Sequence, residues 1–523
     1  MSGSLWMPPG SHPDALPAIP RQRIAPSWAQ PDPLDELAER LDDFIAAAVH
    51  PDEIAALLES DGLSDDQIRE RYGFKNSFAL AEELYERVER RYPEPDGPVH
   101  DPWQVGLLGC LLRGVVFALP GLGYVLGAPL LAGSQDDFGL PAGTVPLLAG
   151  ALVGWTWNQG LAHRAYSWLG LGDRGAARRS LLLGAPAGAL LGALVALVVA
   201  GTAATADPAA VAFAAGQSCY LGAATVLLVM GRERALLAAL LPMAAAAVFA
   251  LAHPLPELAR LTLLPASLLA VAVLALLEVA PAIKESGDGS WTAGLIALLP
   301  FGSYGTVPQA RRSPKLSASL DEQGGAPIAP GLTGSLPYAL FGLGSGVLVL
   351  YAALGDALAD EGTGAVAAPA AVALTLSMGP AEWLLYRFRS GSLAGLRSSS
   401  TPRAFWRTTV GTVMECLSGY LVALLALSLV TSALWPHAPG ITGVRLAGLL
   451  LLGVVLWTGL LLQSFGAVLS AAVICCAAAL AQTAAVVAHA GSPHWIGLIV
   501  HGTAAVAQAA LVCALLGRVT AHR

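Results

Sequence analysis

Charged residues are scarce in this sequence. They make up 13% of its 523 residues, whereas hydrophobic residues make up 55% and the mean hydropathy is +0.61. Soluble domains need charged, solvated surfaces, so this composition excludes an ordinary multidomain soluble protein and predicts a polytopic membrane protein. Lysine is the rarest of the charged residues, with only Lys75, Lys284 and Lys315. Arginine is therefore the default cation, as is usual in bacteria with GC-rich genomes.

Paired cysteines and catalytic motifs are also missing. All six cysteines fall inside apolar runs without the spacing of a zinc or redox site, so we interpret them as small buried hydrophobic residues. There is no Walker motif, no cluster of metal ligands, no catalytic triad and no glycosyltransferase-like acidic pair. We therefore expect no enzyme activity, no cofactor, no metal and no use of ATP by this chain.

Residues 1–33 contain many prolines and no apolar core, which predicts a disordered tail and no cleavable signal peptide. Residues 34–92 have the periodicity of a small helical module, with helices expected at 34–49, from Pro51 to Asp61, after Ser64, and at 77–92. Residues 32–91 hold 17 acidic and 7 basic residues, a net charge of 7 − 17 = −10. This charge disfavours nucleic acid, so we expect the module to pack on the membrane part or on a cytoplasmic partner protein.

After a linker at 93–103, twelve apolar runs follow, each close to the about 20 residues needed to cross the hydrocarbon core. They lie at 104–131, 142–162, 180–201, 208–230, 233–252, 260–283, 335–356, 365–386, 405–433, 443–464, 467–488 and 495–517. The predicted fold is therefore all-α, with membrane halves at 104–283 and 335–523. The connecting residues 284–334 are expected to be cytoplasmic, with an interfacial or re-entrant segment at 291–307.

Basic residues concentrate in alternate loops. Arg174, Arg178 and Arg179 follow the second run, whereas Asp136 and Asp137 lie in the loop before it. By the positive-inside rule, both termini are expected to be cytoplasmic and the protein to reside in the inner (plasma) membrane.

One stretch occurs twice. Residues 157–166 (WNQGLAHRAY) and 378–387 (MGPAEWLLYR) each lead from an apolar run into a basic loop, and Tyr166 superposes on Tyr386 at an offset of 386 − 166 = 220 residues. The other runs recur at roughly this spacing. Both halves begin on the same side, which predicts two parallel repeats related by an axis along the membrane normal.

Ionisable residues within the runs are candidates for a substrate or ion pathway, because burying one in the membrane costs roughly 2.5–3.5 kcal/mol. We expect four of them toward the cytoplasmic side, where they line one water-filled cavity: Arg113, Glu278, Glu382 and Glu415. Alternatively, Glu278 and Glu382 reach headgroup water and Arg113 snorkels. Glu415 has the most apolar neighbours, so we expect it to line the cavity or to pair with Arg113.

Polar uncharged groups form a second set of candidates: Asn158, Gln159, Gln217 and His501. Amides within spans more often join helices than bind substrate. His501 can titrate and so carry a proton.

This layout resembles the multidrug, oligosaccharidyl-lipid and polysaccharide exporter superfamily. The resemblance covers residues 104–518 and rests on the two six-span halves, the Pro120-Gly121 interruption of the first span and the charged residues, without a signature motif. It implies a flippase or exporter of a lipid-linked saccharide or related envelope precursor by alternating access, with Arg113 suited to the pyrophosphate.

Two alternatives remain. The segment Gly172-Asp173-Arg174-Gly175, followed by Arg178-Arg179, is similar to a conserved loop of the major facilitator superfamily, although the spacing differs and the second half has no matching Asp-Arg. That resemblance implies a secondary transporter of a small solute. The other alternative is a non-transporting membrane scaffold that recruits enzymes of envelope synthesis and buries Arg113 and Glu415 in a dry core.

Overall fold

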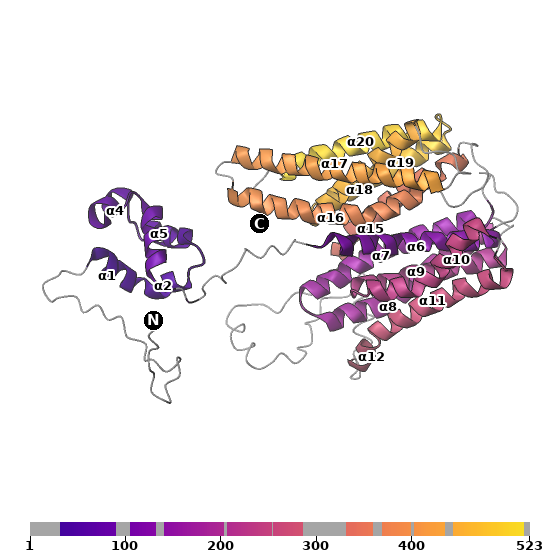
Figure 1. Cartoon of the computed structure of the whole chain (residues 1–523), viewed down its shortest axis with the longest axis horizontal. Helices are drawn as coiled ribbons and strands as arrows, with labels where there is room; N and C mark the ends of the chain where they lie inside the picture. The colour runs from indigo at the N-terminus through magenta and orange to yellow at the C-terminus, as the bar shows by residue number, and fades with distance from the viewer. Residues whose placement is uncertain are drawn as a thin grey trace, which may run out of the picture. The chain divides into compact units, whose positions relative to one another are not determined.

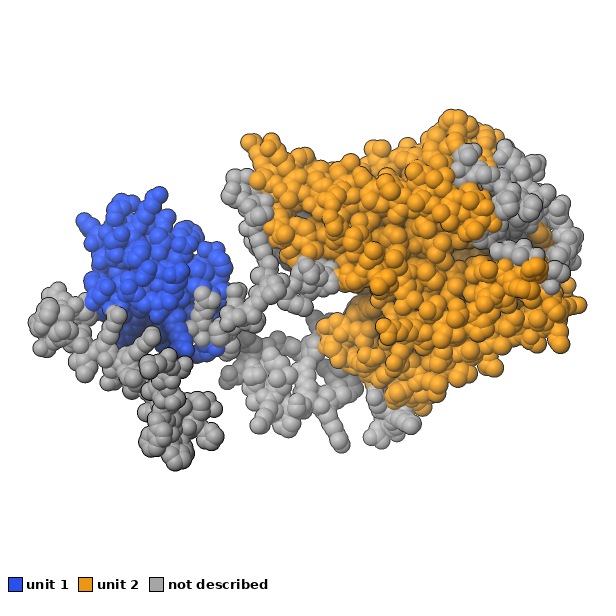
Figure 2. All heavy atoms as spheres, viewed as in Figure 1, with its two compact units in different colours: residues 1–100 blue, residues 101–523 orange. Residues whose placement is uncertain are grey.

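The computed structural model describes residues 32–89, 91, 105–131, 141–202, 207–253, 255–285, 331–358, 369–398, 402–434 and 443–516. The chain divides into two compact units, residues 1–100 and 101–523 (Figure 2). Regular elements within the described ranges are all helical, as predicted. The predictions for the proline-rich tail up to residue 31, the linker 93–103 and the segment 291–307 lie outside the described residues.

Unit 1 contains five short helices around one apolar core. They are α1 (Pro33–Arg40), α2 (Asp42–Ala47), α3 (Pro51–Ser60), α4 (Asp65–Tyr72) and α5 (Ser77–Arg87). Ser64 and Gln67 form a reciprocal capping box at the start of α4, and Ile54 and Leu58 of α3 are fully buried. The predicted helix starts at Pro51 and after Ser64 are therefore confirmed.

Two predicted helix boundaries in unit 1 are wrong. The helix expected at 34–49 is interrupted at Leu41, where φ is −105° and ψ is 10°. In a continuous helix, the side chains of Leu37 and Ile45 would point in directions about 80° apart around the helix axis. The break at Leu41 lets both side chains reach the core. The last helix ends at Arg87 rather than at residue 92, because Val88 takes up extended backbone.

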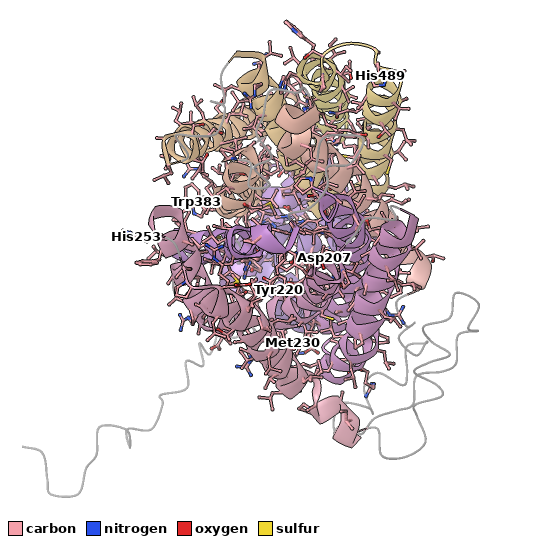
Figure 3. The ribbon with its side chains drawn as sticks, turned by 90° about the vertical axis from the view of Figure 1, so that its right-hand side faces the viewer. Asp207, Tyr220, Met230, His253, Trp383 and His489 are labelled. Atoms are coloured by element: carbon pink, nitrogen blue, oxygen red, sulfur yellow. The ribbon has the colours of Figure 1, made fainter. Side chains whose placement is uncertain are left out.

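Unit 2 contains twelve long helices in two groups within its described ranges (Figure 1). The first group is α6 (Leu107–Leu131), α7 (Thr144–Gly170), α8 (Arg174–Thr202), α9 (Pro208–Val229), α10 (Glu233–Ala252) and α11 (Glu257–Val279), followed by the short α12 (Pro281–Glu285). After the turn η2 (Leu332–Ser335), the second group is α15 (Leu336–Leu358), α16 (Pro369–Ser398), α17 (Pro402–Leu434), α18 (Gly443–Ser464), α19 (Val468–Val487) and α20 (Pro493–Leu516). Seen from one end, the two groups form two bundles, here called the first and second halves (Figure 3).

Within the described residues, ten helices are long and apolar enough to cross a membrane. Large apolar side chains such as Leu190, Val422 and Leu480 are 67–71% exposed on these helices, as expected where a surface faces lipid. The chain is therefore a multi-pass integral membrane protein. The helices α7 and α16 fall short of this apolarity, so the count of twelve spans stays a prediction.

The polarity of α7 and α16 matches their enclosed positions. Helix α7 packs on α8, α9 and α15, and α16 packs on α17 and α6. Helices surrounded by other helices can carry polar side chains that a lipid-facing helix cannot. These two helices also contain the two copies of the repeated stretch.

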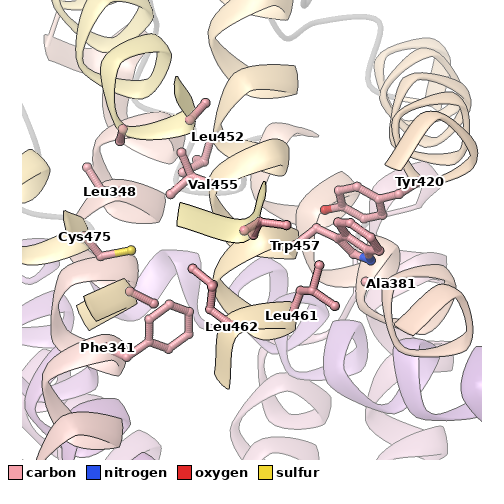
Figure 4. Close-up of a cluster of buried hydrophobic side chains, with 14 of the residues drawn as sticks. Phe341, Leu348, Ala381, Tyr420, Leu452, Val455, Trp457, Leu461, Leu462 and Cys475 are labelled. Carbon is pink, nitrogen blue, oxygen red and sulfur yellow. The ribbon is translucent and has the colours of Figure 1, made fainter. Parts of the chain in front are cut away.

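Each half has its own apolar core. In the second half Trp457 and Leu461 of α18 are fully buried and Tyr420 of α17 stacks on Trp457 at 6.5 Å between ring centroids (Figure 4). The Tyr420 hydroxyl lies 3.1 Å from the Ser377 hydroxyl of α16, so its polar end is satisfied inside the core. The core of the first half includes Leu181, Leu236 and Val271.

The halves meet along two helix pairs, α6 with α16 and α7 with α15. The backbones of α6 and α16 come closest at Gly114 and Gly379, where a Cβ atom on Gly114 would lie 2.8 Å from the Gly379 nitrogen. Glycine is needed at this point because any side chain would clash with backbone. At the other pair, Gln159 of α7 packs on Gly342 of α15.

We expect the substitution Gly114→Ala to force α6 and α16 apart and to lower stability by about 1–3 kcal/mol, the usual cost of overpacking. Gly121→Ala in the same helix is the matched control, because no atom lies within 4 Å of a Cβ there. That control should be neutral or slightly stabilising. Thermal unfolding of the purified proteins in detergent measures both, and equal melting temperatures for the two variants would contradict a tight contact at Gly114.

Candidate functional site

A cluster of three charged side chains joins the halves beside the Gly114–Gly379 contact. Arg113 lies on α6, two turns from its start, and its Nε and Nη2 donate to Glu233 Oε1 at 3.1 and 3.0 Å. Its Nη1 donates to Glu382 Oε1 on α16. Arg113 and Glu233 belong to the first half and Glu382 to the second, so the guanidinium bridges the halves. We call these three residues the Arg113 cluster.

The Arg113 cluster combines one cation with two carboxylates, a formal charge of 1 − 2 = −1. The side chains are 39%, 19% and 21% exposed for Arg113, Glu233 and Glu382. The cluster is therefore open enough to exchange partners with an entering ligand, unlike a sealed core pair. Glu233 is also the first residue of α10, where the helix dipole favours a negative charge.

The two tyrosines that superpose in the repeated stretch both approach this cluster. Tyr386 lies one turn beyond Glu382 on α16 and interacts with Glu382 and Arg113. Tyr166 of α7 lies within electrostatic reach of Arg113, Glu233 and Glu382, and its side chain is 54% exposed. Tyr166 from the first half and Tyr386 from the second half thus both lie within electrostatic reach of the Arg113 cluster.

Glu278 lies in a different cluster, at the end of α11. Its Oε1 accepts from Arg178 at 2.9 Å and its Oε2 accepts from Arg232 at 2.8 Å, while Arg174 lies 3.7 Å away. The carboxylate is 7% exposed. It therefore ties the starts of α8 and α10 to the end of α11, and its ion-pair partners do not include Arg113. The cavity shared with Arg113 stays a prediction. We call this end of unit 2, where α8 and α10 begin, the basic end, and the opposite end the far end.

Glu415 does not pair with Arg113. It lies on α17, is 62% exposed, and accepts from Arg387 Nη2 at 2.6 Å. The prediction followed from its apolar sequence neighbours, but these do not reveal which face of the helix turns outward. The expected pairing is therefore wrong, and of the three predicted carboxylates only Glu382 joins Arg113.

The polar candidates are dispersed. Gln159 lies between the halves, against Gly342, whereas Asn158 beside it is buried and its Oδ1 has no hydrogen-bond partner among the described residues. Gln217 of α9 lines a cavity inside the first half. Their roles in a pathway stay predictions.

His501 of α20 is 3% exposed, and its Nδ1 donates to the Gly448 carbonyl of α18 at 3.0 Å. This bond fixes the proton of the neutral ring on Nδ1. Its Nε2 has no partner within the described part of the chain. The ring borders a cavity of about 60 Å³ near the far end, together with Gln482. His501 is thus well separated along its half from the basic end and is not part of the Arg113 cluster.

Sequence reasoning missed Glu233 and the two tyrosines. Acidic residues are common at the start of a helix because the helix dipole favours a negative charge there. The sequence therefore gives no reason to single out Glu233 as a site residue. Its one signal is its position as an acid between Arg232 and Arg234. For the tyrosines the signal was present, because they anchor the superposition of the two stretches.

The Arg113 cluster can bind an anionic group, because guanidinium forms paired hydrogen bonds with phosphate and carboxylate oxygens. A hollow between the halves opens at the basic end of unit 2, at the left in Figure 2. Among the described residues no group of three or more His, Cys, Asp or Glu side chains is arranged to hold a metal ion. Comparisons with protein-family models and with curated proteins find no match to this chain.

We expect Glu278→Gln to lower stability by about 3 kcal/mol, the low end of the cost of breaking a buried ion pair, because Arg178 and Arg232 lose their shared carboxylate. Glu415→Gln is the matched control. Both partners in its pair are more than half exposed, so its loss should cost no more than about 1 kcal/mol. Thermal unfolding in detergent distinguishes the two, and similar shifts would contradict a structural role for Glu278.

Proposed function

We propose that this protein is a transporter in which the two halves move against each other at the α6–α16 contact. The observation that carries the proposal is the Arg113 cluster, an accessible ion pair between halves at the point where their backbones touch. Breaking this pair frees the halves to separate there. An ion pair between partly exposed side chains can open and close more easily than a buried one, because water solvates the separated charges.

The neighbours of each helix support two equivalent halves. Helix α6 packs on α10 and on α16 of the other half, and α15 packs on α19 and on α7 of the other half. Likewise α9 packs on α11 as α18 packs on α20. This correspondence follows the predicted repeat, with α6 equivalent to α15 and α7 to α16. Parallel repeats around a central pathway are a common transporter architecture.

The substrate class that fits best is an amphiphile with a phosphate or pyrophosphate group, such as a lipid-linked saccharide or a related envelope precursor. Its phosphate oxygens compete with Glu382 for the Arg113 guanidinium. Substrate binding thereby weakens the bond between halves, which couples occupancy to movement. The proposal places the basic end in the cytoplasm and assigns no chemical reaction to the chain.

The alternative functions receive less support. The loop similar to the major facilitator superfamily acts as a helix cap, because Asp173 Oδ1 accepts from the Ala176 nitrogen at 2.7 Å and Gly172 takes a positive φ of 77°. A non-transporting scaffold predicts Arg113 and Glu415 paired in a dry core, whereas both side chains are substantially exposed and have other partners. Recruitment of a cytoplasmic protein by residues 34–92 is compatible with either function.

Vesicles containing the purified protein and a fluorescent lipid-linked saccharide test this proposal. We expect Arg113→Gln to slow translocation by at least about tenfold, because the substrate phosphate then loses a charged hydrogen bond worth more than about 1.4 kcal/mol. Arg113→Lys should also be impaired, because lysine keeps the charge but cannot form paired bonds.

Glu415→Gln is the control for this assay and should translocate normally. Wild-type rates in a correctly folded Arg113→Gln protein would rule out the Arg113 cluster as the site. Absence of translocation by the wild-type protein would instead rule out the substrate class.

A further inference from the structure

A second cavity lies inside the first half, between α6, α9, α10 and α11. It has a volume of about 320 Å³, and its walls are mostly apolar, with Gln217, Tyr220, Arg260 and Ser267 as the polar lining residues. Pro120 of α6 and Pro265 of α11 are among the lining residues. Each proline lacks the N–H that would bond to the preceding turn, although α6 and α11 both continue through it.

The cavity runs from the far end of the half toward the middle of the membrane. Leu130, Ala209 and Arg260 line it near helix termini, because α6 ends at Leu131, α9 begins at Pro208 and α11 begins at Glu257. Tyr220 of α9, labelled in Figure 3, lines its inner part. The eleven steps from Ala209 to Tyr220 rise roughly 17 Å along the helix, close to half of the about 30 Å hydrocarbon core. The length of the cavity along α9 therefore matches the length of a lipid acyl chain in one leaflet.

Arg260 supplies the charge at the outer end of this cavity. Its Nε is buried and has no hydrogen-bond partner among the described residues. No carboxylate of the described part of the chain lies within 4 Å of its guanidinium, although Glu257 is one turn away. A buried donor without a partner is costly, so this position favours an external acceptor. Arg260 is the fourth residue of α11, so a span that begins at Glu257 would place its side chain within reach of the headgroups of one leaflet.

We propose that this cavity is a binding site for one anionic phospholipid of the far-end leaflet. The lipid phosphate accepts hydrogen bonds from Arg260, and one acyl chain lies along α9 and α11 as far as Tyr220. The site is independent of the proposed transport function, because Arg113, Glu233 and Glu382 do not line it. Such a lipid fills the space beside Pro120 of α6.

The purified full chain, delipidated in detergent, provides the test. Phosphatidylglycerol is added, and native mass spectrometry counts bound lipids while thermal unfolding records stabilisation. We expect one tightly bound phosphatidylglycerol per chain and a raised melting temperature. Diacylglycerol, which lacks the phosphate, and inorganic phosphate, which lacks the chains, should each bind at least about tenfold more weakly.

Two variants locate the site. Arg260→Gln should weaken phosphatidylglycerol binding at least about tenfold without altering the apolar walls. Gly216→Leu adds a side chain into the cavity next to Leu268 and should block the acyl chain even with Arg260 present. Arg234→Gln, at an exposed arginine near the basic end, is the matched control and should bind as the wild type does.

Unchanged binding by Arg260→Gln would overturn the proposal, as would phosphatidylcholine bound as tightly as phosphatidylglycerol. Equal stabilisation by inorganic phosphate would mean a free-anion site instead. If Gly216→Leu does not fold, Arg260→Gln and the lipid comparison still decide the question. A failure of lipid binding leaves the translocation assay unaffected, so the two proposals stand or fall separately.

Discussion

The contact between the halves at α6 and α16 depends on one pairing of a cation with a carboxylate. Gly114 and Gly379 let the two backbones touch, and Arg113 then reaches Glu382 across the junction while holding Glu233 within its own half. The glycines supply proximity and the ions supply a bond that a ligand or a proton can break. Apolar packing alone would join the halves without such a means of release.

Ion pairs and hydrogen bonds elsewhere in unit 2 join helices within the same half. Glu278 gathers arginines from α8 and from the turn before α10, so that three helices of the first half are fixed together at the basic end. In the second half Thr458 donates to Gln508, which in turn contacts Cys475, joining α18, α20 and α19. The halves are therefore internally bonded, while the Arg113 cluster and the hydrogen bond between His163 and Ser335 join them to each other. This division is what a rigid-body movement between halves requires.

Much of the fold could be predicted from the sequence, because hydropathy and capping act locally. The apolar runs match the long helices to within a few residues at most ends, and Asp207 caps α9 by accepting a hydrogen bond from the Ala209 nitrogen. The site was predictable only in part. Arg113 stands out as a charge in an apolar run, but its partners depend on how α6, α10 and α16 turn toward one another. Glu415 shows the same limit, since apolar neighbours along the chain surround an exposed face of α17 as readily as a buried one.

We propose that the junction between the halves at Arg113 opens. Double electron–electron resonance between spin labels at Leu171, at the end of α7, and Trp406, near the start of α17, measures the separation of the halves at the basic end. Both sites are exposed, and Cys219 and Cys513 are replaced beforehand because they are exposed too. In lipid nanodiscs we predict two separations whose proportions change in Arg113→Gln. One narrow separation, unchanged by that substitution, would contradict the account.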